Sequence, residues 1–208
     1  DDPSVAFISM AAGVLAAVVT DSPGVLAAFA ALGLIRIVNR STGMAARKSD
    51  SVLLVLLSIA VIYWSDSPLF GGVAALAFLL DGSLKDPQRR QWVFALLCLG
   101  AMVVYMVDHD VGFGQPGVPD SLFEWLSVLF LLMFALNIVL TRKISARGDV
   151  GNRPLDLHRV RGGMVVGLLA ALQGVDRPEG VSVIGAAIAG MCIGMAFRKG
   201  FREPSTSG

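Results

Sequence analysis

The sequence predicts an all-α protein: a polytopic transmembrane helix bundle of about eight short helices with both termini cytoplasmic. Three observations predict it, namely the composition, a series of uncharged runs, and a one-sided distribution of positive charge. Hydrophobic residues make up 55% of the 208 residues and charged residues 16%, against about 25% charged residues in an ordinary globular domain. We therefore expect neither a soluble domain nor a disordered chain.

Eight uncharged, mainly apolar runs divide the chain. Backbone groups in lipid must pair within their own segment, so each run is expected to be a helix. The strands of a membrane barrel would instead show alternating patterns about ten residues long. The eight runs cover residues 3–20, 22–35, 51–65, 67–80, 91–107, 125–141, 162–175 and 180–197.

The runs are predicted to pair into four antiparallel hairpins within one integral membrane domain, 1–208. Three of the four turns contain Asp or Ser before Pro, which suits a helix N-cap followed by the first helical turn. Two runs, 22–35 and 67–80, are shorter than the roughly 20 residues that cross a bilayer. Either their helices extend past the runs or one hairpin is re-entrant. The hairpins cover about residues 4–38, 51–84, 91–141 and 162–198.

The distribution of Lys and Arg predicts the orientation. If the runs cross alternately, sixteen of the 17 basic residues lie on one face and Arg177 alone lies on the other. Short cytoplasmic loops of membrane proteins carry such an excess of Lys and Arg. We therefore expect a multi-pass protein of a bacterial-type inner (plasma) membrane. The sixteen residues are Arg36, Arg40, Arg47, Lys48, Lys85, Arg89, Arg90, Arg142, Lys143, Arg147, Arg153, Arg159, Arg161, Arg198, Lys199 and Arg202.

Acidic residues and one histidine collect where the fifth run ends and the sixth begins. If residue 120 opens a helix, the carboxylate at 124 shares its face and lies partly inside the membrane. Carboxylates there could form an outer vestibule or an ion or proton site. A solvated acidic loop with helix-capping residues is the alternative, and no spacing typical of a metal site is present. The candidate residues are Asp108, His109, Asp110, Asp120 and Glu124.

Among the polar residues within the eight runs, Asn137 in the sixth run is expected to lie deepest. It is expected either to line a solute path below the vestibule or to hydrogen-bond a neighbouring helix. No Lys or His lies mid-run to hold retinal or haem, and phosphate-loop, redox-cysteine and protease motifs are absent from the sequence. We expect no cofactor, no metal and no catalytic residue, and we favour a non-enzymatic protein. The net charge of +1 gives no indication of a nucleic-acid partner.

Two further sets of residues are assigned from their spacing and charge. Pairs of glycines four residues apart let helices approach closely in lipid, whether within one chain or between two. These glycines are Gly163, Gly167, Gly190 and Gly194. The basic loop near residues 141–161 is expected to contact anionic lipid headgroups. Its candidate contacts are Arg142, Lys143, Arg147, Arg153, Arg159 and Arg161.

Three functional classes follow from these patterns. A small-solute or ion transporter or channel comes first, because repeated hairpins, short helices and a polar outer mouth suit a translocation path. A non-enzymatic subunit or scaffold of a membrane complex is the alternative, because the helix interiors carry so little charge. A lipid-modifying enzyme is third. The expected partners are membrane lipids, with a second copy of the chain or other membrane subunits as further candidates.

Overall fold

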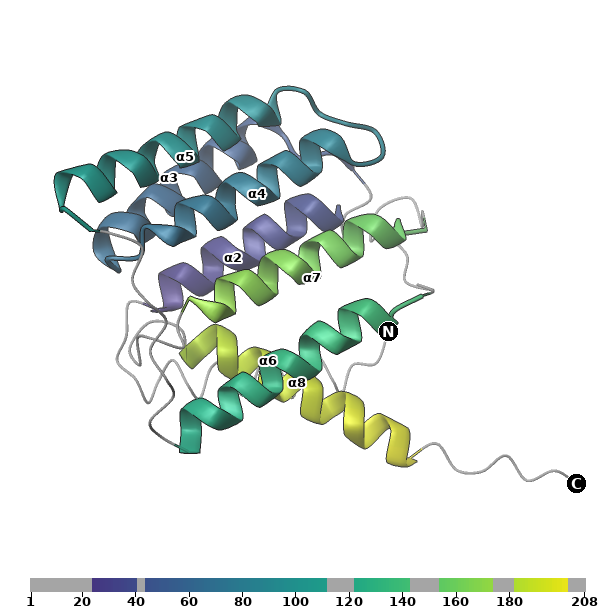
Figure 1. Ribbon diagram of the computed structural model, residues 1–208. Helices are drawn as coiled ribbons and strands as arrows, with labels where there is room; N and C mark the ends of the chain where they lie inside the picture. The colour runs from purple at the N-terminus through teal and green to yellow at the C-terminus, as the bar shows by residue number, and fades with distance from the viewer. Residues whose placement is uncertain (1–23, 41–43, 112–121, 143–153, 174–181, 202–208) are drawn as a thin grey trace, which may run out of the picture.

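The computed structural model describes residues 24–40, 44–111, 122–142, 154–173 and 182–201. Within these residues the protein is all-α, with seven helices and no strand (Figure 1). The first predicted helix, 3–20, lies outside them. The helices are α2 (Gly24–Asn39), α3 (Lys48–Trp64), α4 (Leu69–Ser83), α5 (Gln91–Asp108), α6 (Leu122–Leu140), α7 (Leu157–Leu172) and α8 (Ser182–Phe201).

Successive helices run in opposite directions, so their ends gather at two ends of one bundle (Figure 1). At the first, which we name the basic end, α2, α4, α6 and α8 finish and α3, α5 and α7 begin. The opposite end contains Tyr63 and the last turn of α5, which includes Tyr105. We name it the tyrosine end. The helices therefore alternate in direction as the sequence predicts.

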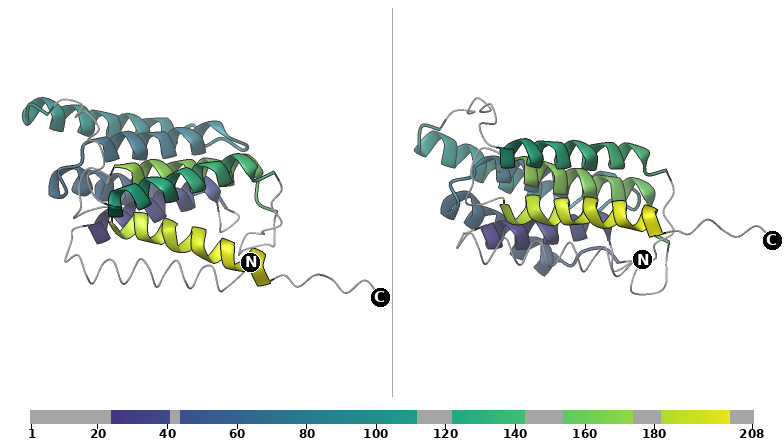
Figure 2. Two further views of the ribbon diagram at one scale, coloured as in Figure 1. Left: turned by 60° about the horizontal axis from the view of Figure 1, so that its bottom comes forward. Right: turned by 90° about the horizontal axis from the view of Figure 1, so that it is seen from below.

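The helices form three groups in space. α3, α4 and α5 lie on one side, α2 and α7 lie in the middle, and α6 and α8 lie on the other side (Figure 1). α6, α7 and α8 pack against one another, as the right-hand view of Figure 2 shows. The buried core runs through the middle group, where Leu34 and Val38 of α2 and Val166 of α7 are fully buried.

The predicted third hairpin, 91–141, is not a packed pair. α5 packs against α3 and α4, whereas α6 packs against α7 and α8 on the opposite side of the bundle. The physical reason is that α5 makes a close contact with α4 instead of with α6. A Cβ atom on Gly71 of α4 would lie 2.9 Å from the carbonyl oxygen of Cys98 and 2.9 Å from Cβ of Met102, both in α5. Complementary small faces thus hold α5 on α4.

α7 begins at Leu157, before the predicted run that starts at residue 162. The side chain of Asp156 caps it, accepting hydrogen bonds from the backbone nitrogens of His158 (2.9 Å) and Arg159 (3.1 Å). The cap brings Arg159 and Arg161, which the sequence places in a loop, into the first turns of a helix.

The glycines of α7 face α2 rather than α8. A Cβ atom on Gly163 would lie 2.0 Å from Oδ1 of Asn39, and one on Gly167 would lie 3.2 Å from Cδ1 of Ile35. Both glycines are buried, and so is Gly190 in α8. Gly194 also lies in α8, but its surroundings are outside what the structure describes.

Only α5, among the described helices, is both long enough and apolar enough to cross a membrane by itself. The other apolar stretches are shorter and comprise Gly24–Asn39, Leu69–Ser83, Glu124–Leu140 and Ile184–Ile193. The all-helical class is therefore confirmed for the described residues. One such helix does not confirm the predicted polytopic bundle.

Candidate functional site

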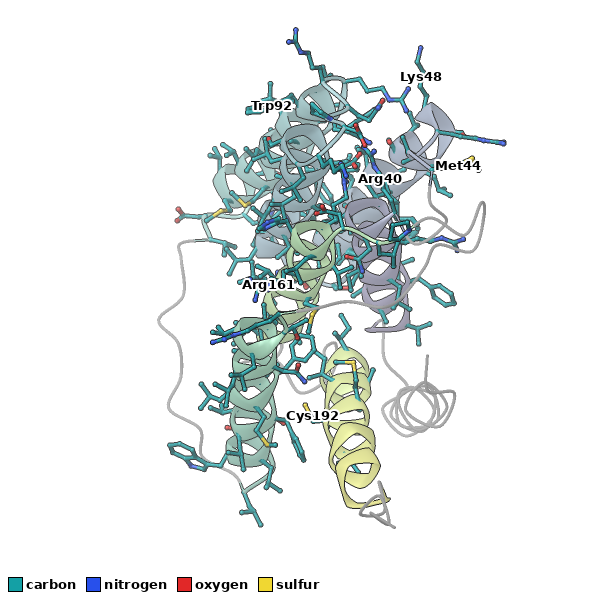
Figure 3. All side chains as sticks on the ribbon, turned by 90° about the vertical axis from the view of Figure 1, so that its right-hand side faces the viewer. Arg40, Met44, Lys48, Trp92, Arg161 and Cys192 are labelled. Atoms are coloured by element: carbon teal, nitrogen blue, oxygen red, sulfur yellow. The ribbon has the colours of Figure 1, made fainter. Side chains whose placement is uncertain are left out.

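A buried charge network joins four helices at the basic end, which Figure 3 views end-on. Its centre is Asp81, fully buried in the last turn of α4. Oδ1 of Asp81 accepts hydrogen bonds from Nη1 of Arg159 at 2.7 Å and from Nε of Arg40 at 3.0 Å. Oδ2 accepts one from Nε2 of Gln91 at 3.0 Å. Arg159 belongs to α7, Gln91 opens α5, and Arg40 directly follows α2.

The two arginines also bind backbone carbonyl groups at helix ends. Arg159 donates from Nη1 to the carbonyl oxygen of Val38 at 3.1 Å and from Nε to that of Lys85 at 3.1 Å. Arg40 donates from Nη2 to the carbonyl oxygen of Asp86 at 2.8 Å. These acceptors lie at or just past the C-termini of α2 and α4, where the helix dipole favours positive charge. The carbonyl groups thus stabilise the second positive charge, which the single Asp81 carboxylate leaves unbalanced.

Arg40 has a left-handed backbone, with φ of 47°. A residue other than glycine adopts this conformation at a cost, and it is common directly after a helix end. The side chain of Arg40 forms an ion pair with Asp81 and is only 12% exposed. The network therefore holds Arg40 at the end of α2.

A buried ion network is not the cheapest way to hold helices together. Well-packed apolar side chains of similar volume are often as stabilising, whereas removal of one partner from a buried pair costs about 3–5 kcal/mol. Buried charged groups often mark a functional position. The Asp81 network is therefore the strongest candidate site among the described residues.

Sequence reasoning missed this network. The predicted run 67–80 ends one residue before Asp81, and the predicted hairpin 51–84 contains it, but Asp81 is not among the predicted site residues. The predicted contact of Arg159 with lipid headgroups is wrong, because Arg159 is 4% exposed. The sequence does contain a signal for this network. Asp81 directly follows the apolar segment 77–80, so it can lie on the same helix as that segment.

The other predicted headgroup contacts are placed as follows. Arg161 caps α6, donating from Nε to the carbonyl oxygen of Thr141 at 2.9 Å and from Nη2 to that of Val139 at 3.2 Å. Arg142 is exposed at the basic end, where it remains available to a headgroup. Lys143, Arg147 and Arg153 lie outside the described residues.

A cluster of aromatic rings forms a second polar site at the tyrosine end. The hydroxyl of Tyr105 donates to Oδ1 of Asp66 at 2.6 Å. The ring of Tyr105 stacks on that of His109 with 4.1 Å between centroids, and Tyr63 meets it edge-on at 5.1 Å. His109 is thus part of an aromatic cluster. Asp108, 3.7 Å from Nδ1 of His109, has a side chain that is 74% exposed.

The residues of the predicted outer vestibule do not come together. Asp108, His109 and Asp110 lie where α5 ends, whereas Glu124 lies in the first turn of α6, on the other side of the bundle. Asp120 lies outside the described residues. Within the part of the chain that the structure describes, no three His, Cys, Asp or Glu side chains lie close enough to hold a metal ion.

Asn137 lies near the basic end rather than midway along a path. It is in the last turn of α6, where the hydroxyl of Thr141 donates to its carbonyl oxygen at 2.7 Å and to its Oδ1 at 3.2 Å. The prediction that Asn137 is the deepest polar group is therefore wrong. The predicted run extends to residue 141, whereas α6 ends at Leu140, shortly after Asn137.

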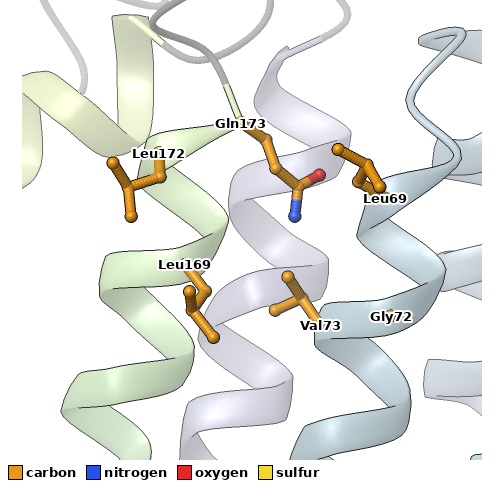
Figure 4. Close-up of a pocket in the computed structure, with 6 residues that line it drawn as sticks. All are labelled: Leu69, Gly72, Val73, Leu169, Leu172 and Gln173. Atoms are coloured by element: carbon orange, nitrogen blue, oxygen red, sulfur yellow. The ribbon is translucent and has the colours of Figure 1, made fainter. Parts of the chain in front are cut away.

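A pocket of about 360 Å³ opens between α4 and α7 at the tyrosine end (Figure 4). Its one polar side chain is that of Gln173, at the end of α7. Ser67, in the turn before α4, donates from Oγ to Oε1 of Gln173 at 3.1 Å. The lining residues are Leu69, Gly72, Val73, Leu169, Leu172 and Gln173.

Comparison with protein-family models, with curated proteins and with solved structures finds no match for this chain.

Proposed function

We propose that the chain is an integral membrane protein whose described helices cross the membrane with the basic end at the cytoplasmic face. The support is the number of large apolar side chains on the outer faces of the helices. Leu96 of α5 is 67% exposed and Leu132 of α6 is 62% exposed. Soluble monomers rarely expose apolar patches larger than a few hundred Å². Exposed on the same two helices are Val93, Leu97, Val103, Val104, Val107, Leu126, Leu129, Met133, Leu136 and Val139.

The ends of the bundle support this orientation. Every Lys and Arg whose side chain the structure describes lies at the basic end, where positive charge marks the cytoplasmic side. Exposed aromatic rings lie at both ends: Tyr63, Trp64 and Trp125 at the tyrosine end, and Trp92 at the basic end. Such rings prefer the level of the lipid headgroups. The last residue of α8 is then on the cytoplasmic side.

Within this arrangement, transport of a small solute is the function that the geometry supports best. The observation that carries it is the Asp81 network, which joins α2, α4, α5 and α7 at the basic end. When two charged groups separate, entering water can solvate them. When two apolar groups separate, exposing them to water costs free energy. An ionic contact at a helix end is therefore suited to a gate that opens and closes. We assign the inner gate to Asp81, Arg159, Arg40 and Gln91.

Cysteine accessibility tests the gate. In a background with Cys98 and Cys192 replaced by alanine, Ala77→Cys introduces a thiol one turn before Asp81, at a fully buried position of α4. In inside-out vesicles, Asp81→Asn should increase the reaction of this thiol with a membrane-impermeant maleimide. Val61→Cys, fully buried in α3 towards the tyrosine end, is the matched control and should stay protected.

Two results would contradict the gate. If Asp81→Asn leaves Ala77→Cys as unreactive as before, the network does not close a path. If Val61→Cys becomes reactive as well, the substitution has unfolded the bundle and the network is only structural.

A subunit or scaffold of a membrane complex is the second candidate. It is favoured by the middle turns of the described helices, which carry no Asp, Glu, Lys, Arg or His. A coupled pump usually carries a charged group there. Purification from native membranes separates the two functions, because a stoichiometric partner supports the subunit and a chain that purifies alone supports transport.

A further inference from the structure

The pocket between α4 and α7 is built for an apolar occupant with one hydrogen-bond acceptor. Five of its six lining residues are leucine, valine or glycine, and no charged side chain lines it. A volume of about 360 Å³ is near the lower limit of ligand pockets, roughly 300–1,000 Å³. It therefore suits one narrow chain better than a whole lipid or a polar solute.

The amide of Gln173 has a fixed orientation. Ser67 donates to Oε1, and the amide nitrogen Nε2 points into the pocket towards Val73 (Figure 4). Nε2 is buried and has no hydrogen-bond partner among the described residues. A buried donor without a partner costs about 1–3 kcal/mol. An acceptor atom inside the pocket would remove that cost.

The rim of the pocket shows which surroundings it opens to. Leu69 and Leu172 line it and are each 46% exposed. In the orientation proposed above, these two exposed leucines would face lipid tails rather than water. Gln173 lies at the tyrosine end, level with the turn that follows Trp64. Aromatic rings of this kind lie at the headgroup level, where the ester groups of lipids are found.

We propose that this pocket binds one acyl chain of a phospholipid from the outer leaflet, with the ester carbonyl of that chain accepting a hydrogen bond from Nε2 of Gln173. The chain lies between Val73 and Leu169. This inference rests on the membrane orientation proposed above, but not on the transport function.

Native mass spectrometry of the detergent-purified protein tests the proposal. The probes are two phosphatidylglycerols with the same chains, one ester-linked and one ether-linked and so without the carbonyl acceptor. The unaltered chain should retain the ester lipid about two- to tenfold better than the ether lipid, as one hydrogen bond predicts. Gln173→Leu should abolish this preference, because it removes the donor but nearly keeps the size of the side chain.

A second variant tests the position of the chain. Leu169→Phe narrows the pocket and should reduce retention of both lipids. Leu132→Phe, on the exposed face of α6, is the matched control and should retain both lipids normally.

The proposal is overturned if the unaltered chain retains the two lipids equally, or if Leu169→Phe retains as much as the control. It is also overturned if no lipid is retained, since another segment of the chain or nothing at all then occupies the pocket. Failure of the proposed membrane insertion would look different, because the protein would then be extracted by alkaline carbonate without detergent.

Discussion

Arg159 and Asp81 are 78 residues apart in the sequence, yet Nη1 of Arg159 donates to Oδ1 of Asp81 at 2.7 Å. Both side chains are at most 5% exposed. The same guanidinium group also binds the carbonyl oxygens of Val38 and Lys85. This one side chain therefore connects the start of α7 to the ends of α2 and α4.

Asp81→Asn should destabilise the protein more than any single exposed substitution. It leaves Arg159 and Arg40 buried without a counter-charge, and breaking a buried pair in this way costs about 3–5 kcal/mol. The measurement is the free energy of unfolding in detergent. Asp108→Asn, at a side chain that is 74% exposed, should have no measurable effect. Equal losses for the two variants would show that the network contributes little.

Tyr105→Phe should lower the free energy of unfolding by about 1.5–3 kcal/mol, the range for hydrogen bonds to charged groups, because the hydroxyl donates to the Asp66 carboxylate at 2.6 Å. The ring is kept, so its stacking on His109 is unchanged. Tyr63→Phe is the control, since Tyr63 meets Tyr105 through its ring. A loss as large for Tyr63→Phe would mean that the hydroxyl of Tyr105 is not the stabilising group.

Gly71→Ala should separate α4 from α5. The added methyl group would lie 2.9 Å from the backbone carbonyl oxygen of Cys98, which cannot move without shifting α5. Gly100→Ala meets nothing within 4 Å among the described residues and should gain about 0.5–1 kcal/mol from helix propensity. Thermal melting in detergent compares them, and the prediction fails if Gly71→Ala melts at or above the temperature of Gly100→Ala.

Gly163→Ala should weaken the contact between α2 and α7, because its methyl group would lie 2.0 Å from Oδ1 of Asn39. The clash involves a side chain, so removing that side chain should relieve it. We expect Asn39→Ala to restore much of the lost stability when combined with Gly163→Ala, and a double-mutant cycle measures this coupling. Additive losses would place the strain elsewhere.

The local features of the fold are largely predictable from the sequence. The uncharged runs identify the described helices, and Asp156 shows why the predicted start of α7 is late, since a capping side chain extends the helix before the apolar run. The gathering of Lys and Arg at one end follows from the alternating direction of the helices, which needs only the order of the runs and their turns. These features depend on neighbouring residues and are therefore encoded locally.

Contacts between distant segments were decided by the tertiary structure. α5 packs on α4 rather than on α6 because Gly71 allows a close approach to Cys98 and Met102, and this separates Glu124 from His109. The carboxylate at 81 lies one residue past the predicted run 67–80, and the guanidinium at 159 belongs to a helix start that the sequence assigns to a loop. The sequence by itself determines which segments are helical and where positive charge collects, because hydrophobicity, capping and charge act over a few residues. Only the packed bundle determines which helix faces meet, because shape complementarity and charge pairing act between side chains far apart in the chain.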